Sequence, residues 1–159
     1  MRILMVCLGN ICRSPLAEGI LQKKAAEAGF HCTVDSAGTN GYHTGEAPHH
    51  LSQKVARSHQ IDISAQRARN FTKNDLENFD IIYAMAGDVL QDIKRIAGSS
   101  DQIHKVTLFL EALHPGTQQD VPDPWYGDED GYHEVFDLIS NTCDQIISTY
   151  NIHQNQATQ

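Results

Sequence analysis

The chain has 159 residues, which is the size of one domain and enough to bury a sizeable core. Its formal net charge of −8 argues against nucleic acid or an anionic membrane surface as a partner. Its 4 cysteines form no dense disulfide framework, and its first apolar run, residues 3–8, is too short for a membrane span or a secretion signal. We therefore expect a cytoplasmic protein, with one domain over residues 1–150 and a polar, frayed tail over residues 151–159.

The N-terminal segment predicts a buried strand, a tight loop and the start of a helix. Residues 3–6, Ile-Leu-Met-Val, form an apolar run typical of a strand covered on both faces. Gly9 and Asn10 tolerate left-handed backbone, so the amide N–H groups of the loop can point inward as a nest for an anion. We expect Ser14 to cap the following helix and Pro15 to take its first position, which aims the positive end of the helix at the loop.

Cys7 and Arg13 stand at the two ends of this loop, with five residues between them. The inward N–H groups, the helix N-terminus and the nearby guanidinium all favour thiolate over thiol at Cys7. Arg13 can hold two phosphoryl oxygens in its planar fork and stabilise their charge in the transition state. The segment therefore predicts a phosphate site with its own nucleophile, in which the phosphate is bound by Leu8, Gly9, Asn10, Ile11, Cys12, Arg13 and Ser14.

Two other interpretations of these cysteines are weaker. A cysteine that ends a buried strand is most often a small core residue, but this one lies between a predicted strand and a predicted helix in a complete nest. Cys7 and Cys12 could ligate a metal, yet no second Cys/His pair at zinc spacing follows them, so we expect no metal and no cofactor. Because they flank one tight loop, Cys7 and Cys12 are instead candidates for a reversible disulfide under oxidation.

The rest of the chain predicts helices and strands in alternation. Helical spacing of apolar residues, and shorter apolar runs that indicate strands, follow one another over residues 15–28, 30–38, 48–59, 80–84, 88–97, 106–110 and 131–150. Such alternation predicts a parallel sheet with helices on both faces and a site at the carboxyl end of the first strand.

The run Cys-Leu-Gly-Asn-Ile-Cys-Arg-Ser-Pro, residues 7–15, resembles the phosphate loop of the low-molecular-weight protein tyrosine phosphatases. The resemblance covers nearly the whole chain and implies a single-domain, three-layer α/β/α fold with a four-stranded parallel sheet in the order 2-1-3-4. It also implies that Asn10, Ser14 and Ser36 form a hydrogen-bond network that holds the loop, with Ser14 donating to the Cys7 sulfur. From the residues alone, Ser36 is typical of an ordinary turn serine.

Two positions depart from the family pattern. Relatives commonly have His-x-Ala-Arg where residues 66–69 of this chain are Gln-Arg-Ala-Arg, so Gln66 replaces the His. They also have Met-Asp where this chain has Met85-Ala86, so Ala86 replaces the Asp. In the family that His and Asp interact with each other and support the loop from behind. Losing both leaves no single buried charge unpaired, and Gln66 can still donate and accept, so we expect a working loop with different support.

Residues 111–130 form the longest irregular stretch, and loops of that length are more often functional than not. A leaving oxygen on phosphorus needs an acid to protonate it, and this stretch offers Asp120 and Asp123. An Asp-Pro pair alone is a common turn dipeptide. Because Asp-Pro-Trp-Tyr-Gly, residues 123–127, resembles the family's Asp-Pro-Tyr-Tyr-Gly, we favour Asp123 as the general acid.

The resemblance also indicates the substrate. Ile11, Tyr42, Trp125 and Tyr126 are expected to line its cleft, although an exposed tyrosine at position 42 would be unremarkable by itself. Relatives that act on phosphoarginine carry Thr where this chain has Ile11, which favours phosphotyrosine-containing proteins as substrates. The residues do not fix the oligomeric state, and a monomer is the default expectation.

The predicted reaction is a two-step hydrolysis through a phosphoryl group on Cys7, with Asp123 acting first as acid and then as base. One rival is an arsenate reductase of the same fold, which needs a further cysteine pair in the middle of the chain; Cys32 and Cys143 are not such a pair. A second rival is a non-catalytic oxyanion or phosphopeptide sensor. Binding alone needs neither a nucleophile nor an acid, so the presence of both argues against it.

Overall fold

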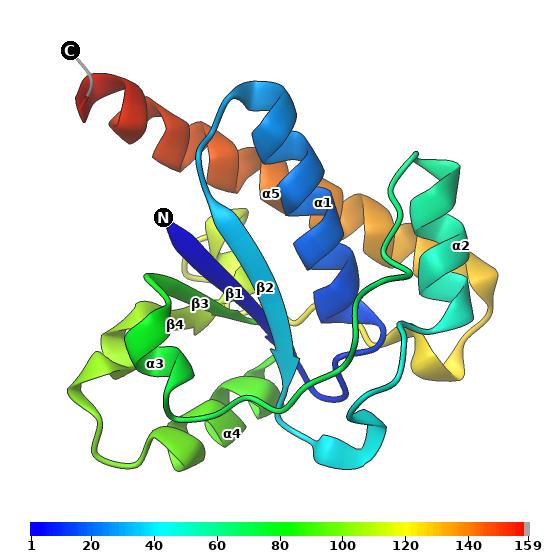
Figure 1. Cartoon of the computed structure of the whole chain (residues 1–159), viewed down its shortest axis with the longest axis horizontal. Coiled ribbons are helices and arrows are strands. Elements are labelled where there is room, and N and C mark those ends of the chain that lie inside the picture. The colour runs from blue at the N-terminus through cyan, green and yellow to red at the C-terminus, as the bar shows by residue number, and fades with distance from the viewer. Residues whose placement is uncertain (158–159) are drawn as a thin grey trace.

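Four parallel strands form a sheet at the centre of the protein (Figure 1). In the computed structural model these are β1 (Arg2–Cys7), β2 (Thr33–Gly38), β3 (Ile81–Ala84) and β4 (Val106–Leu108), in the order β2-β1-β3-β4. Every neighbouring pair is parallel, which confirms the predicted order. The structure describes the backbone of residues 1–157 and the side chains of residues 1–125 and 127–152.

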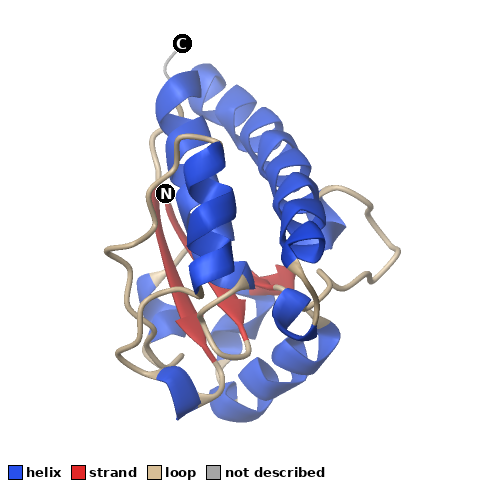
Figure 2. Cartoon of the chain, turned by 90° about the vertical axis from the view of Figure 1, so that its right-hand side faces the viewer, coloured by secondary structure: helices blue, strands red, loops and turns tan. Residues whose placement is uncertain are grey.

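Helices cover both faces of this sheet. They are α1 (Arg13–Ala28), α2 (His50–Ser58), α3 (Asp75–Asn78), α4 (Gly87–Ala97) and α5 (Glu129–Ala157). In Figure 1, α1 and α5 lie on one side of the strands and α3 and α4 on the other, and Figure 2 shows α1 and α5 as neighbouring helices in front of the strands. The predicted three-layer architecture is therefore confirmed. Among the described residues, no helix is both long enough and apolar enough to cross a lipid bilayer.

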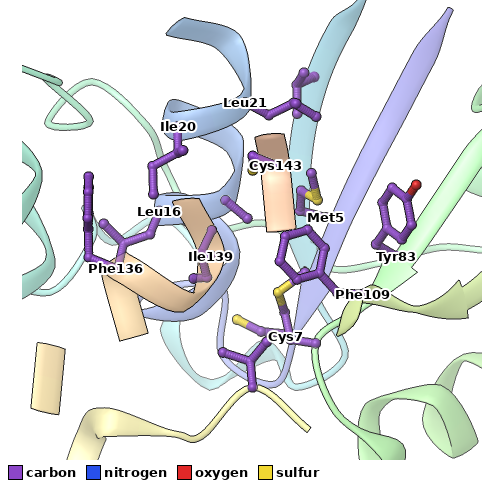
Figure 3. Packing of buried hydrophobic residues seen from close by; sticks show 14 of the residues in the cluster. Met5, Cys7, Leu16, Ile20, Leu21, Tyr83, Phe109, Phe136, Ile139 and Cys143 are labelled. Carbon is purple, nitrogen blue, oxygen red and sulfur yellow. The ribbon is translucent and has the colours of Figure 1, made fainter. Parts of the chain in front are cut away.

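The side chains of β1 alternate between two hydrophobic cores. Ile3 and Met5 pack with α1 and α5, whereas Leu4 and Val6 pack with α4, and all four are fully buried. This strand is buried on both faces, as its unbroken apolar run predicts. Figure 3 shows the larger core, in which Cys7 lies at the end of β1 beneath residues of α1 and α5.

Several element boundaries differ from the prediction, and three of the differences affect the site or the tail. Helix α1 begins at Arg13 with Cys12 as its N-cap, so Ser14 lies inside the first turn and does not cap it. Strand β4 ends at Leu108, because residues 109–112 turn into a 3₁₀-helix. Helix α5 continues through residue 157, so the predicted frayed tail is helical over 151–157, and residues 158–159 lie outside the described residues.

The contact between α1 and α5 provides a stability test with a matched control. Ile20 on α1 is fully buried, whereas Ile152 on α5 is 54% exposed. We expect Ile20→Ala to lower the free energy of unfolding by about 2–5 kcal/mol, because it removes buried methyl groups and leaves a cavity. Ile152→Ala should change it by less than about 0.5 kcal/mol. Urea unfolding of both variants checks this, and equal effects would contradict the assignment of the core.

Candidate active site

The carboxyl end of β1 leads directly into the phosphate loop, residues 7–13. Cys7 is the last residue of β1 and is 2% exposed. Asn10 adopts left-handed backbone with φ of 57°, which turns its N–H toward the Cys7 Sγ at 3.2 Å. Helix α1 then begins at Arg13, so its N-terminus points into the loop. Gly38 lies behind, where a Cβ atom would come within 2.8 Å of the Leu8 carbonyl oxygen.

The side chains that hold this loop form one connected network. The Asn10 Nδ2 donates to the Ser14 Oγ at 2.8 Å and to the Ser36 Oγ at 3.0 Å. Because the Ser14 oxygen accepts from Asn10, its own proton can point to the Cys7 Sγ, 3.0 Å away. The contacts that the resemblance implies for Asn10, Ser14 and Ser36 are therefore present.

Two further residues extend the network, and sequence reasoning missed both. The Ser36 hydroxyl donates to the buried carboxylate of Glu18 at 2.7 Å, and the Arg69 backbone N–H donates to the Asn10 Oδ1 at 3.0 Å. The Arg69 guanidinium contacts Asp35 and Asp75. Glu18 lies among the apolar residues of the predicted helix, but its position in the helical pattern does not indicate that its carboxyl group is buried.

Arg13 joins the phosphate loop to the acid loop, residues 120–127. Its guanidinium is buried; Nη1 donates to the Val121 carbonyl oxygen at 3.0 Å, and Nη2 lies 3.7 Å from the Asp123 Oδ2. The Asp123 side chain is 41% exposed and accepts from the Trp125 N–H at 3.0 Å. Asp120 points elsewhere, because its Oδ1 accepts from the Gly87 N–H in the first turn of α4. This geometry favours Asp123 over Asp120 as the acid.

A cleft of about 260 Å³ opens above the phosphate loop. It is lined by Cys7, Leu8, Gly9, Ile11, Cys12, Arg13, Asn40, Tyr42, His43, Asp123 and Trp125. Three of the four residues predicted for the substrate cleft are among them, namely Ile11, Tyr42 and Trp125. The side chain of Tyr126 lies outside the described residues.

The lining also differs from the prediction in two ways. The side chains of Asn10 and Ser14 are buried and do not line the cleft, and the phosphate-binding role of these two residues stays a prediction. Asn40 and His43, on the same loop as Tyr42, also line the cleft, and neither residue was predicted individually. In the part of the chain that the structure describes, no group of three or more His, Cys, Asp or Glu side chains is placed to hold a metal ion.

Cys12 is the second sulfur beside the site. It is buried, and its Sγ lies 3.7 Å from the Tyr132 hydroxyl. Burial raises the pKa of Cys12 to about 12, despite the hydrogen bond to Tyr132, so Cys12 is a thiol at neutral pH. Cys7 and Cys12 are not joined in a disulfide, and both line the same cleft. Their role as a redox pair stays a prediction.

The positions that depart from the family pattern do not face each other in this chain. The Gln66 Nε2 donates to the Pro15 carbonyl oxygen in the first turn of α1 at 3.1 Å. Ala86 is the N-cap of α4 and belongs to the core on the opposite face of the sheet. The mutual support that the family's His and Asp give each other is therefore absent here, and the Asp120 carboxylate supplies an acceptor to the first turn of α4.

A thiol in an anion nest, a buried guanidinium and a half-exposed carboxyl group, together at the carboxyl edge of a parallel sheet, define a cysteine-dependent phosphatase. The family model described as "Low molecular weight phosphotyrosine protein phosphatase" matches residues 2–157. The chain therefore belongs to the low-molecular-weight protein tyrosine phosphatase family.

Individual relatives agree with this assignment over nearly their full lengths. YfkJ of Bacillus subtilis, a low molecular weight protein-tyrosine-phosphatase, is 36% identical over 92% of this chain and 94% of its own. The low molecular weight phosphotyrosine protein phosphatase of Schizosaccharomyces pombe is 37% identical over 85% of this chain and 87% of its own. The crystal structure of a protein tyrosine phosphatase from Entamoeba histolytica superimposes with a TM-score of 0.89 at 31% identity, covering 97% of this chain and 99% of that one.

Glu18 makes the stability of the protein depend on pH. Burial raises the pKa of Glu18 from 4.5 to about 7, although Ser36 and Gln22 donate hydrogen bonds to it. As the pH rises, the unfolded chain therefore loses this proton first. The contribution of Glu18 to stability is fully present below about pH 4.5 and is lost as the pH rises through about 7, with a total change of about 3 kcal/mol.

We expect Glu18→Gln to remove this loss, because the amide stays neutral while it can still accept from Ser36. Urea unfolding between pH 4.5 and pH 8 should show a flatter profile for this variant than for the unaltered chain. Glu27→Gln is the matched control, since Glu27 lies on the same helix with a side chain that is 65% exposed. A Glu18→Gln profile as steep as that of the unaltered chain would contradict the assignment.

Proposed function

We propose that the protein hydrolyses phosphotyrosine in proteins through a covalent intermediate on Cys7. The observation that carries this proposal is the distance of 3.0 Å between the Cys7 Sγ and the Ser14 Oγ, inside a loop whose Asn10 N–H also points at that sulfur. These donors stabilise a thiolate at the floor of the cleft. Family membership supports the same activity.

In the first step, the Cys7 thiolate attacks phosphorus in line with the leaving phenolic oxygen. A sulfur–phosphorus bond forms as the phosphorus–oxygen bond breaks, and Asp123 gives its proton to the departing oxygen. Arg13 and the N–H groups of the phosphate loop hold the three equatorial oxygens and stabilise their charge. The contact of 3.7 Å between Arg13 and Asp123 supports these roles, because it brings both groups to the same end of the cleft.

In the second step, Asp123 is ionised and takes a proton from a water molecule. The water oxygen bonds to phosphorus, the sulfur–phosphorus bond breaks, and inorganic phosphate leaves with the Cys7 thiolate restored. Ser14 can stabilise this leaving thiolate with its hydroxyl proton, because its oxygen accepts from Asn10 and the proton is free to point to the sulfur. The reaction consumes one water molecule and needs no cofactor.

The cleft wall supports an aromatic substrate. Ile11 lines the cleft as a buried side chain, and Tyr42 and Trp125 stand at its rim, where they are 84% and 42% exposed. Such side chains can sandwich a phenyl ring, with an aromatic pair contributing about 0.5–1.5 kcal/mol beyond its buried area. A protein of net charge −8 attracts phosphate through Arg13 and the loop amides alone, so we infer that it binds neither nucleic acid nor an anionic membrane surface. Its proposed substrates are cytoplasmic phosphoproteins.

Hydrolysis of aryl phosphates without added metal tests the proposal. We expect Cys7→Ser to abolish activity, because the hydroxyl is a far weaker nucleophile. Asp123→Asn should lower kcat/KM about 10²–10⁴-fold, since the leaving oxygen then departs without its proton. Asp120→Asn is the matched control and should change kcat/KM by less than Asp123→Asn, because Asp120 binds α4 instead of lining the cleft.

A second comparison tests the substrate. The unaltered chain should hydrolyse a phosphotyrosine peptide faster than a phosphoarginine peptide, because Ile11 and the aromatic rim fit a phenyl ring. A chain that binds phosphate without turning over any ester would favour the sensor, and thiol-dependent reduction of arsenate would favour the reductase.

A further inference from the structure

One imidazole ring connects the phosphate loop, the acid loop and helix α5. The backbone N–H of His49 donates to the Ile11 carbonyl oxygen at 2.8 Å, which fixes His49 to the phosphate loop. Its ring contacts Trp125 of the acid loop and Tyr132 of α5. We propose that His49 is a positioning residue that holds Trp125, and with it Asp123, in place beside the phosphate loop. The proposal rests on the function proposed above.

The ring of His49 is fixed at its own helix. Its Nδ1 accepts from the Leu51 N–H at 3.1 Å and so caps the N-terminus of α2. A backbone N–H can only donate, so Nδ1 carries no proton and the remaining ring proton sits on Nε2. Asn, Asp, Ser and Thr are the usual capping residues. A capping imidazole performs a second task that these shorter side chains cannot, because its ring extends to the neighbouring loops.

Among the described residues, three aromatic rings contact that of His49, and the nearest is His50, stacked at 4.4 Å and 26°. The centroid of the His49 ring lies 5.2 Å from that of Tyr132 with the planes stacked at 19°, and 5.3 Å from the Trp125 ring at 73°, edge to face. Tyr132 in turn reaches the Cys12 Sγ with its hydroxyl at 3.7 Å. Trp125 therefore packs against a ring that is tied by hydrogen bonds and stacking to the rigid part of the site.

The position of Trp125 matters for the acid. The Trp125 N–H donates to the Asp123 Oδ1, so a shift of the Trp125 backbone moves the carboxyl group directly. Arg13 holds the same loop from inside through the Val121 carbonyl oxygen. His49 holds it from outside through the Trp125 ring. A displacement of the acid by about 1 Å can cost up to 10²-fold in rate, which sets the scale of the expected effect.

Protonation of His49 should release this contact. The titratable groups around its ring are His50 on α2, Tyr132 on α5, Cys12 at the start of α1 and, beside Trp125 on the acid loop, Asp123. Burial, and then the charge of His50, lower the pKa of His49 below 6.5, so the ring is neutral at pH 7. In acid the added proton removes the acceptor from Nδ1 and places positive charge at the N-terminus of α2, where it is unfavourable.

The fluorescence of Trp125 reports this event directly, because Trp125 is the only tryptophan in the sequence. His43 also contacts its ring, at 5.5 Å, so the titration is made in a His43→Asn background. We expect a transition with a midpoint below pH 6.5 that is absent when His49→Asn is added. His59→Asn is the matched control, because His59 stacks on Phe136, and it should leave the transition in place. A transition that persists in the His49→Asn protein would overturn the proposal.

Kinetics with two leaving groups separate positioning from mere capping. Asn at position 49 can still cap α2 but offers no ring to Trp125, so His49→Asn should keep the melting temperature close to that of the unaltered chain. We expect it to lower kcat/KM about 10-fold for phenyl phosphate and by less for p-nitrophenyl phosphate, whose leaving group needs the acid less. If the variant and the unaltered chain have the same kcat/KM for phenyl phosphate, and also the same kcat/KM for p-nitrophenyl phosphate, His49 only caps the helix.

The two measurements also keep this proposal separate from the proposed function. The Trp125 titration needs no turnover. If the unaltered chain proves inactive on every ester, the proposed function fails while the titration still shows whether His49 holds the Trp125 ring. If the chain is active but the titration shows no step that depends on His49, the positioning role fails alone.

Discussion

The left-handed backbone at Asn10 is the constraint on which the active site depends. With φ of 57°, this residue turns its N–H toward the Cys7 sulfur, and few residue types other than glycine accept that conformation readily. Asparagine also uses its whole side chain: both Nδ2 protons go to Ser14 and Ser36, and Oδ1 accepts from the Arg69 N–H. Glycine could adopt the turn but could not tie it to its surroundings. The loop is therefore preorganised for a phosphate before any substrate arrives.

The two carboxyl groups of the acid loop have different tasks. Asp120 binds the first turn of α4, whose N-cap is Ala86 and offers no side-chain acceptor. This contact anchors the start of the loop, whereas Asp123 remains partly exposed at the cleft beside Arg13. One end of the acid loop is thus attached to the helical layer below the sheet, and the other is packed through Trp125 against His49. Such anchoring at both ends keeps the acid within reach of a leaving oxygen.

Local sequence signals predicted the first strand and the phosphate loop, because each is a continuous run of neighbouring residues. The strand order depends on contacts between distant segments, and it was expected only from the resemblance to the family, as was the choice of Asp123 over Asp120. The start of α1 was predicted wrongly for a physical reason. Ser14 looks like a helix cap, but its hydroxyl is used by Cys7 and Asn10, so the helix begins earlier and Cys12 caps it without a side-chain bond. Glu18, His43 and His49 could not be assigned from sequence, since their partners are distant in the chain.

The central claim is that the Cys7 sulfur carries the phosphoryl group during turnover. The most direct test mixes the enzyme with an aryl phosphate, stops the reaction within one turnover by denaturation, and locates the added phosphoryl group by mass spectrometry of peptides. The account predicts a phosphorylated peptide that contains Cys7, with the group on sulfur. A phosphoryl group on another residue, or rapid turnover with no phosphorylated enzyme at any time, would contradict it.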